Sequence, residues 1–442
     1  MDKELLKQII IEWQEFSFPN LIERDYRIPL DSMKIITITG PRRSGKTSLI
    51  FLLIQRLLKK GIKKEQILFI NFDDPRLMPF DAPGIENLMN SYRELYPENL
   101  NKINFIFFDE IQSVRDWEIA VRRLYDTKKF RIFLTGSSSK MLSREIATNL
   151  RGRAVNFEIL PFSFKETLKA KGVKPDKNIA YSQKRFEIIN ILNSYFELGG
   201  FPEIILENNN GLKIRILKEY IETTFFRDLV ERYNIKNQSL MRELIRYLVT
   251  NISSDFTLNA FFKWIKQTYP ITKRTLINYV NYLEDINLFF FIRKYSVSLK
   301  QQALAPRKTY IVDNGFRNAY GFKFSDDKGK VLENTVFLEL KQKLIKNPLM
   351  ELYYWKNYKK YEVDFVVKNG KDIKCLIQVC SDLSDFKTKE REIRALVEAS
   401  RELNCDKLFI ITLDYNGEEK INSQKIIYKA VWGWLIENAV KF

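Results

Sequence analysis

The segment at residues 34–60 limits what this chain can fold into more than any other feature of its sequence. A short β-branched run, KIITIT, ends at a glycine, and from Thr47 onward leucines recur at helical spacing. The pattern GxxxxGK[ST] joins the two and consists of Gly40, Pro41, Arg42, Arg43, Ser44, Gly45, Lys46 and Thr47, and Ser48 follows it. This order predicts a strand, a phosphate-binding loop and a helix in direct succession.

The residue types of this loop suit the chemistry of a bound polyphosphate. Glycines let successive backbone N–H groups turn toward phosphates at a helix N-terminus. The ammonium of Lys46 reaches the β and γ oxygens, and the hydroxyl of Thr47 is a ligand for Mg²⁺. We therefore expect a nucleotide and Mg²⁺ to bind here.

Three more apolar runs follow the loop, at residues 66–72, 103–108 and 130–134, with segments long enough for a crossover helix between them. Runs that are apolar on both faces are typical of a parallel sheet covered by helices. We predict an α/β domain over residues 1–160.

Polar side chains follow two of these runs. Asp109 and Glu110 come directly after FIFF; Asp109 is suited to hold Mg²⁺, and Glu110 to orient or deprotonate an attacking water. The next run ends in TGSSS, which places Thr135 and Ser137 beside the γ-phosphate if the strands are neighbours. The alternative for TGSSS is an ordinary serine-rich turn.

The amino-acid composition excludes several kinds of catalytic and metal-binding site. The chain of 442 residues has no histidine, which excludes Ser-His-Asp and Cys-His nucleophiles and every histidine-containing metal site. Its 73 Lys and Arg against 55 Asp and Glu give a formal charge of +18, so an acidic partner such as nucleic acid or anionic lipid is the first expectation. Three cysteines without CxxC spacing indicate buried thiols in a reducing compartment, and no apolar run approaches membrane-spanning length. We expect a cytoplasmic protein that does not span a membrane.

The middle of the chain reads as helical, with no strand signal from residue 161 until about residue 288. We assign residues 161–240 to a helical lid or linker and residues 241–327 to a winged-helix-like domain, because two helices at 257–269 and 273–283 flank a short turn and precede a strand pair. The candidate nucleic-acid contacts are Lys273, Arg274, Arg293 and Lys294. The alternative is a helical lid that packs on its own core.

Six segments in this order carry a family resemblance: GPRRSGKTS, FIFFDEIQ, LTGSSS, LRGR, LPFSF and GGFPE. The chain resembles prokaryotic and archaeal AAA-superfamily P-loop ATPases whose catalytic domain is followed by a winged helix and a restriction-endonuclease-like domain. The resemblance implies ATP as the nucleotide, Lys46 and Thr47 as Walker A, Asp109 and Glu110 as Walker B, and Thr135 or Ser137 as sensor.

The LRGR segment supplies candidates for an arginine that approaches the γ-phosphate. Arg151 and Arg153 could do so within the chain or toward a neighbouring subunit, or they could be a surface pair that contacts carboxylates or DNA phosphates.

Residues 328–442 form a second α/β unit, in which the resemblance implies nuclease positions. Restriction-type nucleases place an acid on a helix, an Asp at a strand and Glu-x-Lys on the next strand, where the carboxylates bind Mg²⁺. Here Glu333, Asp364, Gln378 and Cys380 stand at these positions. Strand alternation puts Gln378 and Cys380 on one face. Gln and Cys remove one ligand charge and the lysine, although Glu362 could compensate, so we expect a degenerate site.

The sequence therefore leads to a specific functional expectation. The chain is expected to be a Mg²⁺-dependent ATP-hydrolysing switch or motor that acts on or with DNA. Two alternatives remain open, a non-catalytic nucleotide-dependent switch for a protein partner and an ATP-gated nuclease. The sequence identifies neither the partner nor the oligomeric state.

Overall fold

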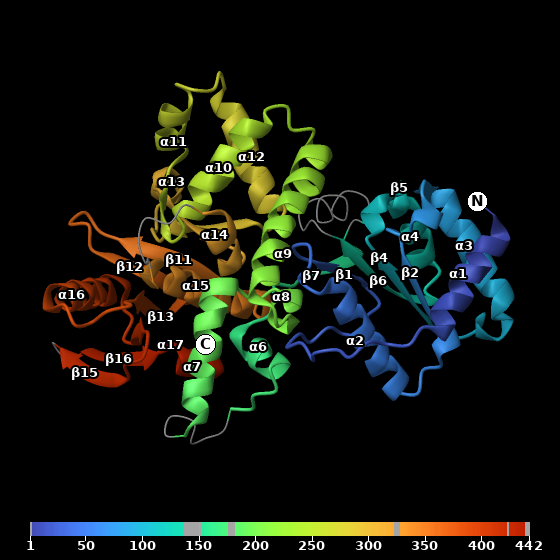
Figure 1. The fold of residues 1–442 in the computed structure, drawn as a ribbon, viewed down its shortest axis with the longest axis horizontal. Helices are drawn as coiled ribbons and strands as arrows, with labels where there is room; N and C mark the ends of the chain where they lie inside the picture. Colours follow the sequence, from blue (N-terminus) through green and yellow to red (C-terminus); the bar gives the residue numbers. More distant parts are fainter. Residues whose placement is uncertain are drawn as a thin grey trace. The chain divides into compact units, whose positions relative to one another are not determined.

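The computed structural model describes residues 2–136, 150, 152–175, 182–321, 328–421 and 424–437. It divides into two compact units (Figure 1). The first unit comprises Met1–Leu160 with Asp285–Asn287, and the second comprises Pro161–Glu284 with Leu288–Phe442.

The first unit is built on a five-stranded parallel sheet. Its strands are β1 (Ile35–Thr39), β2 (Ile67–Asn71), β4 (Asn104–Asp109), β6 (Phe130–Gly136) and β7 (Ala154–Glu158). They lie in the order β2-β4-β6-β1-β7, so β6 separates the strand before the phosphate-binding loop from the strand that ends in Asp109. The α/β architecture expected from the apolar runs is confirmed, and the two polar strand ends lie on neighbouring strands.

Helices cover both faces of this sheet. Those on one face are α1 (Lys3–Glu15), α3 (Ala82–Leu95) and α4 (Trp117–Asp126), and their apolar side chains share one core with alternate residues of β2, β4 and β6 (Figure 1). On the other face, Phe51 of α2 (Lys46–Lys59) contacts Phe69, and Phe107 stacks on Phe133 with ring centroids 4.5 Å apart. A short strand pair, β3 (Phe80–Asp81) and β5 (Val114–Arg115), lies outside the main sheet.

The second unit begins with helices. In chain order these are α6 (Phe164–Ala170), α7 (Lys184–Leu198), α8 (Pro202–Leu206), α9 (Asn210–Thr223), a π-helical stretch at Thr224–Glu231, α10 (Gln238–Thr250), α11 (Leu258–Ile265) and α12 (Lys273–Asp285). The strand β8 (Ser254–Phe256) lies between α10 and α11. The expectation of no strand before residue 288 is therefore wrong, because three residues are too few to produce a visible alternation.

The rest of the second unit is organised around one large sheet. Its elements are β9 (Phe289–Lys294), α13 (Leu299–Leu304), β10 (Arg307–Ile311), α14 (Asn314–Tyr320), α15 (Lys328–Lys346), β11 (Met350–Lys356), β12 (Glu362–Asn369), β13 (Asp372–Val379), α16 (Phe386–Leu403), β14 (Leu408–Thr412), β15 (Gly417–Ile421), β16 (Gln424–Ala430) and α17 (Val431–Ile436). The nine strands lie in the order β15-β16-β14-β13-β12-β11-β9-β10-β8. Because β9 pairs with β11, backbone hydrogen bonding continues from the region before residue 327 into the region after it.

The GGFPE segment forms a tight junction within the second unit. Gly199 has φ 77°, and a Cβ there would lie 1.5 Å from Oδ1 of Asp313. The Asp313 carboxylate accepts the backbone N–H of Gly200 at 2.7 Å and that of Gly315 at 2.8 Å. Burial raises the pKa of Asp313 to about 7. The glycine pair thus lets the chain after α7 close around a buried carboxyl group.

We expect Gly199→Ala to destabilise the protein strongly. An alanine here would be strained by the left-handed backbone and would also clash with Asp313. The two costs add, so the free energy of unfolding should fall by about 2–4 kcal/mol. Gly172→Ala is the matched control, because Gly172 has φ 75° and a Cβ there would meet no heavy atom within 4 Å. It should cost about 1 kcal/mol. Urea unfolding measures both variants. If Gly199→Ala and Gly172→Ala lose the same unfolding free energy, the contact with Asp313 does not make Gly199 necessary.

Candidate functional site: the phosphate loop and its neighbouring strands

Residues 40–48, here called the phosphate loop, connect β1 to the first turn of α2. Gly40 has φ 154°, and a Cβ there would lie 2.2 Å from the carbonyl oxygen of Ile159. Gly45 has φ 92° and is the N-cap of α2. A side chain at the first position would strike backbone, and one at the second would be strained. Both glycines of the sequence pattern are therefore required by the local conformation.

Lys46 is buried at the start of α2. Its ammonium donates to the carbonyl oxygens of Gly40 and Pro41, each at 3.3 Å. It also forms an ion pair with Glu110, with 3.7 Å between Nζ and Oε1. The lysine of the loop and the second acid after β4 are thus neighbours.

Asp109 connects three elements of the site through its two carboxylate oxygens. Thr47 at the start of α2 donates its hydroxyl to Oδ2 at 2.6 Å. Thr135 at the end of β6 donates its hydroxyl to Oδ1, and its oxygen accepts the backbone N–H of Glu110 at 2.9 Å. Thr135 therefore braces the Asp109-Glu110 pair in this structure.

The electrostatics of Asp109 follow from its position. Burial raises the pKa of Asp109, and the nearby Glu110 carboxylate raises it further. Hydrogen bonds from Thr135 and Thr47 and the charge of Lys46 act in the opposite direction. Glu110 itself adopts a left-handed backbone with φ 52°, a strained conformation for a residue other than glycine. A buried carboxyl group and a strained acid therefore lie side by side next to the loop.

Arg24 supports the phosphate loop and was missed by sequence reasoning. Its buried guanidinium donates to the carbonyl oxygen of Ser44 at 2.9 Å and to that of Leu160 at 2.7 Å. Tyr26 lies under this guanidinium, 5.2 Å from ring centroid to Cζ, and its hydroxyl accepts the backbone N–H of Leu160 at 3.1 Å. Because Arg24 lies outside any periodic pattern and 20 residues before Ser44, no sequence signal identifies it.

Of the remaining candidates in the first unit, Ser137 and Arg151 lie outside the described residues. Arg153 precedes β7, and its carbonyl oxygen accepts the backbone N–H of Ile35 at the first residue of β1. Five strand residues then separate it from the phosphate loop, a rise of roughly 16 Å. Its guanidinium pairs with Asp126 at 3.4 Å. Arg153 is therefore at the wrong edge of the sheet to approach the phosphate loop of its own chain.

The candidate nucleic-acid contacts lie in the second unit. Lys273 and Arg274 are the first two residues of α12, and both are exposed. Arg293 and Lys294 are the last residues of β9, which has β10 on one side and β11 on the other. They therefore lie within the large sheet, and the connection that follows them contains α13.

The structure brings three of the four nuclease-like positions together. Gln378 on β13 accepts the backbone N–H of Asp364 on β12 at 3.2 Å, and Glu333 on α15 reaches the same cluster through Lys308. Cys380 follows the last residue of β13; its thiol donates to the carbonyl oxygen of Asp382, and burial raises its pKa to about 11. Lys308 was missed, since it lies 56 residues before Asp364.

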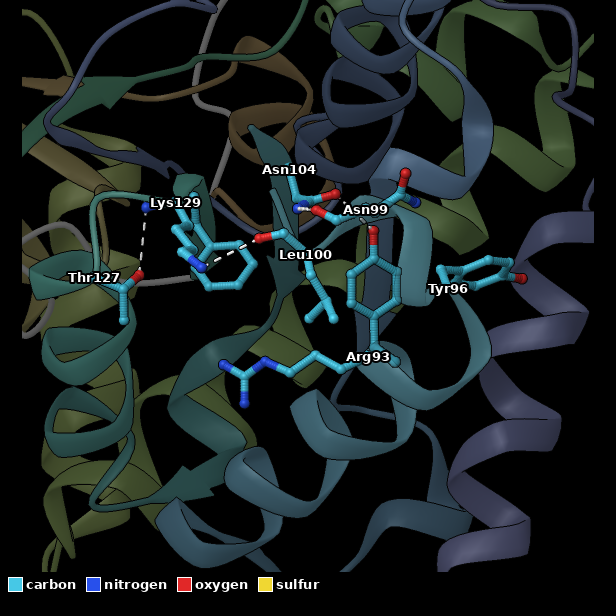
Figure 2. A pocket seen from close by; sticks show the side chains of 9 residues that line it. Arg93, Tyr96, Asn99, Leu100, Asn104, Thr127 and Lys129 are labelled. Atoms are coloured by element: carbon cyan, nitrogen blue, oxygen red, sulfur yellow. Dashed lines mark hydrogen bonds between the residues drawn. The ribbon is translucent and has the colours of Figure 1, made fainter. Parts of the chain in front are cut away.

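A cavity of about 200 Å³ lies elsewhere in the first unit (Figure 2). Asn104 and Phe130, at the amino ends of β4 and β6, contribute to its wall. Within the wall, Tyr92 donates to Oδ1 of Asn104 at 3.2 Å and Lys129 donates to the carbonyl oxygen of Leu100 at 3.2 Å (Figure 2). The phosphate loop follows the carboxyl end of β1, so this cavity is not part of its site.

The described residues contain neither a membrane-spanning helix nor a ready-made metal cluster. None of the described helices combines the length and the apolar character needed to cross a bilayer. No group of three or more Cys, Asp or Glu side chains in the described ranges is arranged to hold a metal ion. All three cysteines are buried free thiols, as expected.

Comparisons with known proteins agree with the geometry of the first unit. Residues 32–168 match a family model described as an AAA domain. Residues 189–327 and 328–431 match two further models, each described as a domain of unknown function (DUF8612 and DUF4143). The fold and the site together define a nucleotide-binding domain of the AAA ATPase type.

Relatives extend over most of the chain. Uncharacterized protein MJ1544 of Methanocaldococcus jannaschii is 37% identical over 95% of this chain and 92% of its own length, so the chain belongs to the same protein family as MJ1544. An uncharacterized protein of Haemophilus influenzae is 29% identical over 91% of this chain and 94% of its own length. MJ1637 of M. jannaschii is 25% identical over 81% of this chain and 76% of its own length.

On the ATPase function expected from the sequence, Thr135→Val should slow ATP hydrolysis while the fold is retained. The substitution keeps the volume but removes the hydrogen bond to Asp109 and the acceptor for Glu110, and a hydrogen bond to a charged group is worth about 1.5–3 kcal/mol. The turnover rate should fall at least about 10-fold. Thr37→Val on β1, whose hydroxyl contacts Asn156, is the control and should keep normal turnover. A normal rate in Thr135→Val would contradict the bracing role.

Proposed function

We propose that the chain is a cytoplasmic, Mg²⁺-dependent ATP-hydrolysing switch or motor that acts on or with DNA. The observation that carries the ATPase part is the contact set around Asp109, in which Thr47, Thr135, Lys46 and Glu110 converge from three neighbouring elements. Phosphoryl transfer requires positioning and charge stabilisation more than covalent chemistry by the protein. This contact set supplies both at the end of a phosphate-binding loop.

The ion pair between Lys46 and Glu110 suggests how nucleotide binding prepares the site. The Lys46 ammonium contacts the carbonyl oxygens of Gly40 and Pro41 and forms an ion pair with Glu110. Phosphate oxygens are stronger partners for this ammonium than carbonyl oxygens. When Lys46 turns toward the phosphates, Glu110 loses its cation and becomes available to orient water. We therefore propose that phosphate binding to Lys46 weakens its ion pair with Glu110.

The donor set at Thr47 and Asp109 fits a magnesium ion. A hydroxyl and a carboxylate oxygen 2.6 Å apart are hard oxygen donors of the kind that Mg²⁺ prefers beside phosphates. Bound Mg²⁺ neutralises charge that develops on the β and γ phosphates. Thr135 would keep Asp109 in place when the Thr47 hydroxyl turns away from it.

Lys46→Ala should abolish steady-state ATP hydrolysis, because it removes the ammonium that the loop pattern places on the β and γ phosphates. We expect a loss of about 10²-fold or more. Lys59→Ala at the end of α2 is the charge-matched control and should hydrolyse ATP at the normal rate. Persistent turnover in Lys46→Ala, at a level seen in the control, would refute the ATPase assignment.

The DNA part of the proposal rests on the region around α12. Its elements follow the order α10, β8, α11, α12, β9, β10, which is the order of a winged-helix domain, and β10 pairs with both β8 and β9. One face of α12 is buried, through Leu276, Tyr279, Val280 and Leu283. The opposite face is exposed and carries Lys273, Arg274, Ile277, Asn278 and Asn281.

This exposed face has the residue types that read a DNA major groove. Lysine and arginine at the start of the helix suit phosphate contacts, and asparagine amides can pair with adenine edges. The apolar Ile277 is suited to a thymine methyl group. The face carries no acidic side chain between Lys273 and Asn281, so its charge favours a polyanion. We therefore propose that α12 contacts duplex DNA.

The double variant Lys273→Ala and Arg274→Ala should weaken DNA binding and reduce its salt dependence. Two lost phosphate contacts should lower the slope of log K against log salt by about 2. Lys59→Ala with Lys60→Ala removes the same charge from exposed positions in the first unit and should leave the slope unchanged. Fluorescence anisotropy with labelled duplexes measures both. Identical slopes in the two variants would contradict the proposed contact between α12 and DNA.

A second candidate function, a nucleotide-dependent switch for a protein partner, has its own supporting observation. Val297, Leu299 and Leu304, in and beside α13, are 95%, 79% and 76% exposed. Apolar side chains gathered at such exposure mark protein contacts in many proteins. Salt separates the two candidates, because a mainly apolar protein interface lacks the steep salt dependence of phosphate contacts.

A further inference from the structure

Lys308 occupies the centre of a carboxylate cluster in the second unit. Its ammonium lies 2.7 Å from Oδ1 of Asp364, 2.7 Å from Oε1 of Glu362 and 3.1 Å from Oε1 of Glu333. The side chain is 3% exposed. The lysine comes from β10, while its partners come from β12 and α15. One buried cation therefore joins three elements that are distant in sequence.

The oxygens of this cluster are also engaged by other donors. The second oxygen of Asp364 accepts the backbone N–H of Val379 at 2.9 Å. The second oxygen of Glu362 pairs with Lys356 at 2.7 Å, and Glu333 accepts the hydroxyl of Tyr310 at 2.8 Å. These contacts give the carboxylates protein partners on more than one side.

A divalent metal of the restriction-nuclease type does not fit this donor set. In that arrangement the carboxylates face the metal, and the residue at the position of Gln378 adds a ligand. Here the Gln378 amide oxygen accepts the N–H of Asp364 and its amide nitrogen donates to Glu392. The place between the acids already holds an ammonium.

We propose that Lys308 replaces the divalent cation of a nuclease-like centre, so that the C-terminal domain is held together without metal and does not cleave DNA. This ammonium comes from β10 and not from the strand of Gln378. Its role here is to join β10 to α15 and β12. Since β10 also pairs with β9, which follows α12, the cluster anchors the proposed DNA-binding region to the large sheet.

Mn²⁺ binding to the full-length protein without nucleotide tests this proposal. The number of bound ions, followed by the electron paramagnetic resonance signal of free Mn²⁺, should be the same in the wild type and in Asp364→Asn. Lys308→Met should bind one additional Mn²⁺, because it leaves a carboxylate cluster without its cation. Adding Asp364→Asn to Lys308→Met should remove that ion.

Lys356→Met is the matched control, because Lys356 also pairs with Glu362 but is 31% exposed. It should bind no additional ion. If the wild type binds one more Mn²⁺ than Asp364→Asn, the cluster is a metal site with Lys308 beside it, and the proposal is overturned. A folded Lys308→Met that gains no ion overturns it as well. Should Lys308→Met fail to fold, the comparison of wild type with Asp364→Asn still decides.

Discussion

The hydrogen bonds to the buried Asp109 carboxylate are the interaction on which the first unit's site depends. Thr47 approaches from α2 and Thr135 from β6, while Asp109 itself ends β4. An ionised carboxyl group is costly to bury unless donors and a cation surround it. The strand order β4-β6-β1 satisfies this requirement, because it places the two hydroxyls and Lys46 at one edge of the sheet. The same contacts arrange the residues that the proposed phosphoryl transfer needs.

The second unit meets a similar requirement with a different cation. Glu333, Glu362 and Asp364 lie close together, and the Lys308 ammonium between them offsets the cost of burying them. In the first unit the buried carboxylate remains adjacent to a loop that is shaped for phosphates. In the second unit the carboxylates are paired with protein donors. The acidic centre of the first unit is therefore suited to ligand binding, and that of the second unit to joining elements of the fold.

Sequence patterns predicted four of the five strands of the first unit's main sheet, because their signals are local, but they missed β7. The β-branched and apolar runs became β1, β2, β4 and β6, and the two glycines of the phosphate loop took the conformations that require glycine. The short β8 was missed because three residues carry no visible period. Arg24 was missed because its contact with Ser44 depends on how a segment without regular spacing folds back.

By itself the sequence determined the phosphate loop, the acids after β4 and the amphipathic α12, since each depends on neighbouring residues and on backbone geometry. Tertiary structure alone decided that Thr135 contacts Asp109 and that Lys308 enters the acidic cluster. It also decided that Arg153 lies beside the amino end of β1, away from the phosphate loop. The physical reason is that a buried charge is stabilised by whichever donor the fold brings within about 3 Å, at any separation along the chain.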